Sequence, residues 1–300
     1  MKTTDSGCAF HKAVLTLPHT TTIVALVASV LLASCATVVR APAGIEPERF
    51  LPADALVYAR LDQPTLVAAM ARLPAAEAKS AATIAERTDG MTVAFVKQPG
   101  TARGGLVAVA EGRYPAGAAS LKLASDPLWR RNGAVWERKD GSLNLAFTDG
   151  GRVFLGTAPL DGLIAAAAVP NPDPIPPRWA DEWSASIAVF MPNPMALMRS
   201  RLPLGDSDVP LLAMMLSARP VTGSTYTASL SFEFQSERMA TVFSPLCRLF
   251  LYAAATALWP ERSATVLDEA VWSTAGSTVT ARNLPLDADS IAAFAITAGN

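Results

Sequence analysis

Few side chains in this sequence could carry out chemistry. The adjacent carboxylates Asp181 and Glu182 could belong to a pair for glycoside cleavage, although neighbouring acids at the mouth of a strand are usually a solvated turn. Ser120 and Lys122 come closest to a serine–lysine pair, but residues two apart on a helix do not face each other. Cys247 could be a nucleophile, yet its apolar neighbours favour a buried and inert thiol. None of these patterns is typical of an enzyme class.

The tetrapeptide Leu32-Ala33-Ser34-Cys35 indicates where the protein resides. Lys2 and Lys12 precede an apolar run at residues 23–33, and small residues come directly before the cysteine. This segment resembles a bacterial lipoprotein signal, which implies that Cys35 is lipidated and becomes the first residue of the mature chain. The alternative is a plain transmembrane anchor, but the unbroken apolar run is shorter than the roughly 20 residues that a span needs.

Cleavage before Cys35 would remove both histidines, His11 and His19. A mature chain without histidine excludes Ser-His-Asp and Cys-His catalysis, histidine-ligated zinc and a histidine pH switch. With Cys35 lipidated, Cys247 would be the one free thiol, so no intramolecular disulfide could form. The sequence also contains no P-loop, no G-x-G-x-x-G after a strand and no Cys-x-x-Cys. We therefore expect no cofactor and no dedicated transition-metal site.

The composition limits the class of partner. The 300-residue chain has a formal charge of −1, and removal of residues 1–34 takes away Lys2, Lys12 and Asp5, which leaves about −2. This balance indicates neither a nucleic acid nor a polybasic membrane contact. Charged residues make up 17% of the chain and apolar residues 51%. That excess of apolar residues favours a surface that meets lipid or another apolar partner.

Proline-rich stretches divide the chain. Residues 35–50 contain three prolines or glycines and no apolar period, so we interpret them as a tether. Residues 170–178 begin with five prolines in eight positions, which predicts a stiff linker. The expected organisation is thus a signal peptide at residues 1–34, the tether, a first unit at 51–169, the linker, and a second unit at 179–300.

The two units are expected to be related α+β folds, each a mostly antiparallel sheet with helices packed on one face. Asn-Gly and Asp-Gly pairs between residues 132 and 151 predict tight turns between short antiparallel strands. Short motifs recur in the same order in both units, which we interpret as an internal duplication of about 120 residues, with one strand lost from the second copy. The clearest matches are Ala134-Val135-Trp136 with Ala270-Val271-Trp272, and Pro159-Leu160-Asp161 with Pro285-Leu286-Asp287.

The second unit differs from the first most at residues 236–259, which predict one long apolar helix with Ser236 as its N-cap. A narrow polar stripe runs along this helix, and larger apolar side chains lie opposite it. We expect these side chains to contact membrane lipid or an apolar ligand. They are Met239, Phe243, Leu246 and Phe250.

This helix has three conceivable placements: buried against the sheet, lying in the membrane interface, or spanning the bilayer. Its length suits a span, but Arg248 near its centre and Pro245 just before it both disfavour one. The interfacial placement predicts that Phe250→Asp abolishes binding to lipid and leaves the fold intact. The buried placement predicts that the same substitution unfolds the protein.

Two weaker resemblances concern the folded part. The sequence Phe-Leu-Pro-Ala-Asp-Ala-Leu-Val-Tyr-Ala-Arg-Leu-Asp at residues 50–62 is similar to the first strand of uncharacterised secreted bacterial proteins that begin on a Leu-Pro-Ala-Asp turn. The whole layout is similar to treponemal outer-membrane-associated lipoproteins, whose amphipathic helices enter the lipid layer. That resemblance implies a periplasm-facing protein of the outer membrane. Ala36 after the lipid cysteine is compatible with export to that membrane.

These observations together favour a non-catalytic lipoprotein of the cell envelope, anchored through acyl chains on Cys35. Its second unit would contact membrane lipid or an apolar ligand. The first alternative is a binding or assembly module that meets another envelope protein through the apolar helix. The second alternative is a hydrolase that works with carboxylates alone, which would require a pocket with two converging carboxylates.

Overall fold

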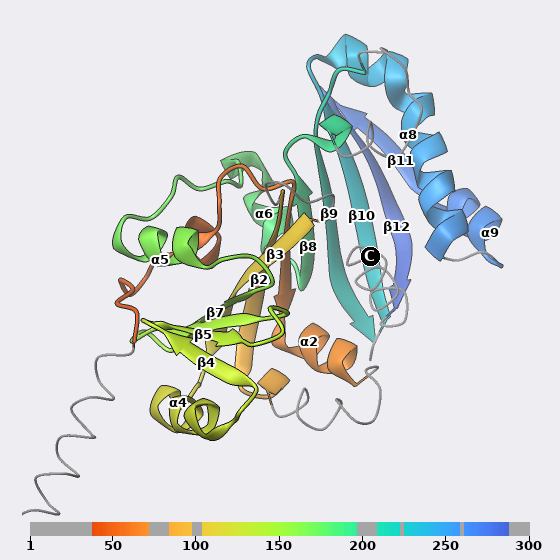
Figure 1. Ribbon diagram of the computed structural model, residues 1–300. Coiled ribbons are helices and arrows are strands. Elements are labelled where there is room, and N and C mark those ends of the chain that lie inside the picture. Colours follow the sequence, from red (N-terminus) through yellow and green to blue (C-terminus); the bar gives the residue numbers. More distant parts are fainter. Residues whose placement is uncertain are drawn as a thin grey trace, which may run out of the picture. The chain divides into compact units, whose positions relative to one another are not determined.

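The computed structural model describes residues 38–71, 84–97, 104–196, 209–222, 225–258 and 261–287 (Figure 1). The chain divides into two compact units, Met1–Thr37 and Val38–Asn300, and all the described residues belong to the second. The predicted signal peptide and Cys35 lie outside the described residues. The lipoprotein signal therefore stays a prediction from the sequence.

The described strands form one 12-stranded antiparallel sheet with the order β11-β12-β10-β9-β8-β1-β2-β3-β7-β6-β5-β4. This confirms the α+β class and the antiparallel pairing, but the two predicted units share a single sheet. The strands are β1 (Val57–Asp62), β2 (Thr88–Lys97), β3 (Gly104–Gly112), β4 (Trp129–Asn132), β5 (Val135–Arg138), β6 (Asn144–Phe147), β7 (Arg152–Gly156), β8 (Ile187–Met191), β9 (Leu211–Thr222), β10 (Thr225–Phe234), β11 (Val271–Ala275) and β12 (Thr278–Asp287).

The β1–β8 pair joins the two halves of the sheet. Tyr58 pairs with Phe190, and both side chains are buried. Outward from this pair, the first half continues with β2, β3 and β7, and the second half with β9, β10 and β12. In the first half, three strands (β5 to β7) lie between the start of the Ala-Val-Trp motif and the Pro-Leu-Asp motif. In the second half, only two strands (β11 and β12) cover the same interval. The strand orders thus correspond, and the duplication itself stays a prediction.

Helices lie on both faces of the second half, not on one face as expected. Met215 of β9 shares a core with Trp183, whereas Ala218 shares a core with Leu251 of α8. Residues three apart on a strand point to opposite faces, so these two cores lie on opposite sides of the sheet. The helices are η2 (Pro47–Phe50), α2 (Gln63–Met70), α4 (Ala116–Ser125), α5 (Asp161–Ala168), η3 (Pro177–Trp179), α6 (Ala180–Trp183), α8 (Glu237–Leu258) and α9 (Ser263–Glu269).

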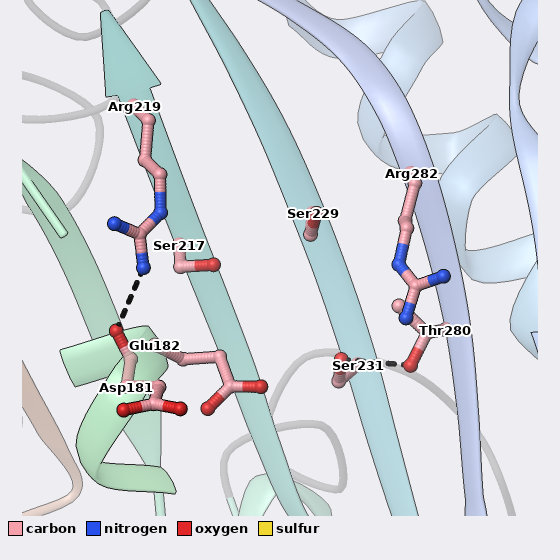
Figure 2. A pocket seen from close by; sticks show the side chains of 8 residues that line it. All are labelled: Asp181, Glu182, Ser217, Arg219, Ser229, Ser231, Thr280 and Arg282. Carbon is pink, nitrogen blue, oxygen red and sulfur yellow. Dashed lines mark hydrogen bonds between the residues drawn. The ribbon is translucent and has the colours of Figure 1, made fainter. Parts of the chain in front are cut away.

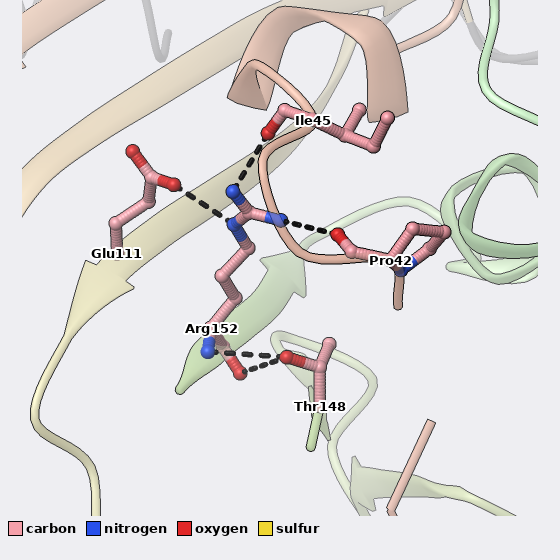
Figure 3. A network of polar contacts seen from close by, with 5 residues as sticks. All are labelled: Pro42, Ile45, Glu111, Thr148 and Arg152. Atoms are coloured by element: carbon pink, nitrogen blue, oxygen red, sulfur yellow. Dashed lines mark hydrogen bonds and ion pairs between the residues drawn. The ribbon is translucent and has the colours of Figure 1, made fainter. Parts of the chain in front are cut away.

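The predicted tether is packed against the sheet from Val39 onward. The amide of Val39 donates to the carbonyl oxygen of Phe147 (2.8 Å), and the side chain of Val39 is buried. Arg152 of β7 then holds the following turn, because its guanidinium donates to the carbonyl oxygens of Pro42 (3.3 Å) and Ile45 (2.6 Å) (Figure 3). The same guanidinium pairs with Glu111 at 2.8 Å. Charge-assisted bonds to backbone oxygens thus fix a segment whose composition resembles a spacer.

The predicted linker is fixed in the same way. The amide of Asn171 donates to the carbonyl oxygen of Arg49 (2.9 Å), and its side-chain amide donates to that of Leu51 (2.8 Å). Ile175 is buried in the main core. The prolines of this segment remove amide donors. The amide of Ile175 binds the side chain of Asp173 within the segment, and Asn171 binds η2 and the residue after it.

One buried carboxyl group belongs to this packed N-terminal segment. Glu48 is only 6% exposed, and its Oε1 accepts a hydrogen bond from Trp183 Nε1 (3.2 Å). Burial raises the pKa of Glu48, and the nearby carboxylates of Asp173 and Glu46 raise it further.

Replacing Glu48 with glutamine is expected to weaken the pH dependence of stability. Because the folded pKa is raised, the contribution of Glu48 is fully present below the unfolded pKa and is lost as pH rises through the folded pKa. Glutamine stays neutral and keeps an oxygen for Trp183. The variant should therefore be more stable than the wild type near pH 7, and the difference should shrink near pH 4. Urea unfolding at both pH values measures this, and equal pH profiles would contradict it.

Candidate functional site

α8 carries the residues that the sequence assigns to function, and it forms nearly as expected. The hydroxyl of Ser236 accepts a hydrogen bond from the amide of Met239 (3.3 Å), as an N-cap does. Pro245 lies inside the helix, which continues beyond it. From Glu237 to Thr256 the helix is long and apolar enough to cross a membrane, yet only 22% of its apolar window is buried in the protein. Most of this apolar helix is thus exposed, whereas the core helix of a soluble domain is mostly buried.

The inner face of α8 packs on β10 and β12. The ring of Phe243 stacks on Phe234 with 6.0 Å between centroids, and Phe250 stacks on Phe232 with 6.4 Å. These contacts bind both halves of the helix to the sheet. The other α8 side chains that are buried on this face are Ala240, Cys247, Leu251 and Ala255.

The structure places the four predicted contact residues mainly on this inner side. Met239, Phe243 and Phe250 are half-buried against the core, and Leu246 is half-buried as well. Their contact with lipid or ligand stays a prediction. Two of them, Met239 and Phe243, line an open hollow of about 550 Å³ together with Val209, Pro210 and Gln235.

The outer face of α8 exposes apolar side chains that the sequence analysis did not assign. Val242 is 60% exposed, Leu249 59% and Tyr252 51%. Residues at these spacings lie on one side of a helix. The spacing is present in the sequence, but α8 is apolar over most of its circumference. Only the position of the sheet determines which apolar face of α8 is packed and which is exposed.

Two further α8 residues lie where the sequence analysis expects them. Cys247 is buried, its thiol donates to the carbonyl oxygen of Phe243 (3.6 Å), and burial raises the pKa of the thiol to about 12. The burial of Cys247 is as expected, and the raised pKa disfavours the thiolate, which is the reactive form. Arg248 is exposed on the polar stripe, and its guanidinium lies 5.4 Å from the ring centre of Trp272.

The candidate carboxylates line a second pocket, which lies on the face of β9, β10 and β12 opposite α8. Its volume is about 200 Å³. Asp181 and Glu182 stand on the short helix α6 at its rim, and the strands supply arginine and hydroxyl side chains (Figure 2). The pocket is lined by Asp181, Glu182, Ser217, Arg219, Ser229, Ser231, Thr280 and Arg282.

This arrangement gives little support to a carboxylate-dependent hydrolase. Glycosidases place two carboxylates on either side of the bond that breaks. Asp181 and Glu182 are consecutive residues of one short helix, and both therefore approach from the same rim. Among the residues that the structure describes, no group of three His, Cys, Asp or Glu side chains is placed to hold a metal ion.

Comparison with known proteins concerns the fold. No protein-family model matches the sequence, and no curated protein does. The fold resembles that of TP0453. Crystal form III of TP0453 superposes with a TM-score of 0.59 at 14% identity, over 86% of this chain and 100% of that one. Crystal form IV gives a TM-score of 0.60 at 15% identity, over 84% and 97%.

TP0453 is a treponemal outer-membrane-associated lipoprotein. The resemblance noted from the layout of the sequence thus agrees with the structural likeness at the level of the fold. At 14–15% identity the likeness shows the fold alone.

Proposed function

We propose that this protein is a non-catalytic lipoprotein of the cell envelope that rests on a lipid surface through the outer face of α8. Acyl chains on Cys35 would provide the permanent anchor, and α8 would provide a second, reversible contact. The observation that carries the proposal is the exposure of Val242, Leu249 and Tyr252 on a helix whose inner face already packs on the sheet. The resemblance to treponemal outer-membrane-associated lipoproteins supports the periplasmic face of the outer membrane as the location.

The outer face of α8 suits the membrane interface. Burying one large apolar side chain contributes about 1.5–3 kcal/mol, so three contribute several kcal/mol before the cost of ordering. A contact of this size is reversible by itself and becomes persistent when a lipid anchor holds the protein at the membrane. Tyr252 has an apolar ring and a polar hydroxyl, which suits the boundary between lipid and water.

A helix that lies on the membrane fits these contacts better than one that spans it. A spanning α8 would have to leave β10 and lose the ring stacking of Phe243 and Phe250. It would also carry Arg248 into the hydrocarbon at about 2.5–3.5 kcal/mol on insertion scales. In the interface, the inner face keeps the sheet and the outer face meets the acyl boundary.

Replacing Leu249 with aspartate is expected to abolish flotation of the unlipidated chain, residues 36–300, with liposomes. Leu249 is 59% exposed, so the fold should tolerate the charge, whereas a carboxylate within the apolar contact opposes burial in lipid. We expect the floated fraction to fall at least about tenfold, which corresponds to a loss of ~1.4 kcal/mol in the free energy of membrane binding.

The matched control is Leu121→Asp, which alters a 65% exposed leucine on α4. It should leave flotation unchanged. Failure of the wild-type fragment to float, or equal loss in both variants, would contradict the proposed contact. Specific retention of an envelope protein without flotation would instead favour the assembly module.

A further inference from the structure

The pocket on the face of the sheet opposite α8 is not used by the proposed function. Its chemistry is polar, and its two ends carry opposite charges. Arg219 and Arg282 stand on strands, whereas Asp181 and Glu182 stand on α6 (Figure 2).

Two arginine side chains line the pocket on either side of β10 (Figure 2). Arg219 is on β9 and Arg282 on β12, the two strands that flank β10. Neighbouring strands are about 4.8 Å apart, so the two carrier strands lie about 10 Å apart. Neither guanidinium forms an ion pair with another residue in the described part of the chain. Arg219 donates instead to the backbone oxygen of Asp181 (3.0 Å) (Figure 2). Both side chains are exposed, so their charged groups are accessible from solvent.

Hydroxyl groups form the floor between these arginines. Ser217 pairs in register with Ser229, and Ser231 pairs with Thr280. The hydroxyls of Ser231 and Thr280 bond to each other at 2.9 Å, whereas those of Ser217 and Ser229 make no hydrogen bond to another described residue. Ser217 is only 9% exposed, and its side chain lines the base of the pocket. A hydroxyl that bonds nothing in the protein can donate to an anionic oxygen.

The rim supplies the opposite charge. The side chains of Asp181 and Glu182 form no ion pair with another described residue, and the carboxylate of Glu182 points toward the floor (Figure 2). The two carboxylates balance the two guanidinium groups, so the pocket has no net charge. A bare anion or cation would meet repulsion at one end, whereas a neutral ligand with separated charges would not.

We propose that this pocket binds a small zwitterion of the phosphoethanolamine class. The phosphate would lie between Arg219 and Arg282 above the serine hydroxyls, because guanidinium groups bind phosphate oxygens through paired hydrogen bonds. The primary ammonium would reach Glu182. The volume of about 200 Å³ equals roughly seven water molecules at ~30 Å³ each, which is enough for such a head group. The ligand is either a soluble phosphodiester or the head group of a lipid.

The test is calorimetric titration of the complete protein, purified in a detergent without phosphate. The probe is glycerophosphoethanolamine, with glycerol phosphate and ethanolamine as the two half-ligands. The zwitterion should bind at least about tenfold more tightly than either half. Absence of binding, or equal binding of glycerol phosphate, would overturn the proposal.

Single substitutions test which residues bind the phosphate and which bind the ammonium group. Arg282→Gln should weaken binding of the zwitterion by at least about tenfold, because a charged partner of the phosphate is lost. Glu182→Gln should reduce the preference for the zwitterion over glycerol phosphate. Arg113→Gln, which alters an exposed arginine after β3, is the control and should change neither. Arg282 and Glu182 lie at the surface, so neither substitution should unfold the protein. Circular dichroism of each variant checks this. Equal effects of Arg113→Gln and Arg282→Gln would overturn the assignment.

A final pair of titrations separates the two sources. Short-chain phosphatidylethanolamine should bind more tightly than glycerophosphoethanolamine if the head group belongs to a lipid. It should bind more weakly if the natural ligand is the soluble phosphodiester, because acyl chains then hinder entry. Either result supports the class of ligand, whereas binding of neither contradicts it.

Discussion

Cys35→Ala is expected to abolish stable attachment to the membrane. The residues before Cys35 resemble a lipoprotein signal, and the thiol of that cysteine is the atom that would receive the lipid. Two acyl chains hold a protein on a membrane persistently, whereas one gives only marginal binding. The loss should therefore be all or none: the variant stays unprocessed or becomes soluble, and it leaves the detergent phase in a phase-partition experiment.

Cys247→Ala is the matched control for this experiment. Cys247 is buried within α8, so its replacement should cost about 1 kcal/mol of stability and leave partitioning unchanged. Partitioning of Cys35→Ala into detergent at the wild-type level would refute the lipoprotein assignment. In that case α8 would be the remaining candidate for membrane contact.

Phe250→Asp is expected to destabilise the fold strongly, although the sequence offered it as a test of membrane binding. The ring is half-buried, stacks on Phe232, which is completely buried, and packs against the core between α8 and the sheet. Truncation of a fully buried phenylalanine costs about 3–5 kcal/mol, and loss of a half-buried one costs less. A carboxylate against the apolar neighbours adds a desolvation cost. We expect a decrease of about 3 kcal/mol or more in the free energy of unfolding, measured with urea.

Leu249→Asp, at the adjacent position, provides the comparison. Leu249 points away from the sheet, so the same charge should change the free energy of unfolding by less than about 1 kcal/mol. Two neighbouring substitutions should thus separate the two faces of α8, one through stability and the other through binding to lipid. Similar stability of the two variants would mean that the inner face does not hold the helix on the sheet.

The sequence by itself determined the local features of the protein. The Asn-Gly and Asp-Gly turns lie between short antiparallel strands, since glycine adopts the positive φ that such turns require: φ is +59° at Gly133 and +74° at Gly141. The long helix begins after Ser236, and Cys247 is buried in it as its apolar neighbours indicate. Caps, turns and periodicity depend on residues a few positions apart, so these features could be predicted.

Only the tertiary structure decided which surfaces remain exposed. Because β10 lies under Phe250, one apolar side of α8 packs on the sheet, and Leu249 on the other side is exposed to solvent. Arg152 fixes residues that resemble a tether, through hydrogen bonds across more than 100 positions of sequence. The pairing of β9, β10 and β12 likewise brings Arg219 and Arg282 into the lining of one pocket. These outcomes depend on long-range strand register, which the apolar period of a single segment does not specify.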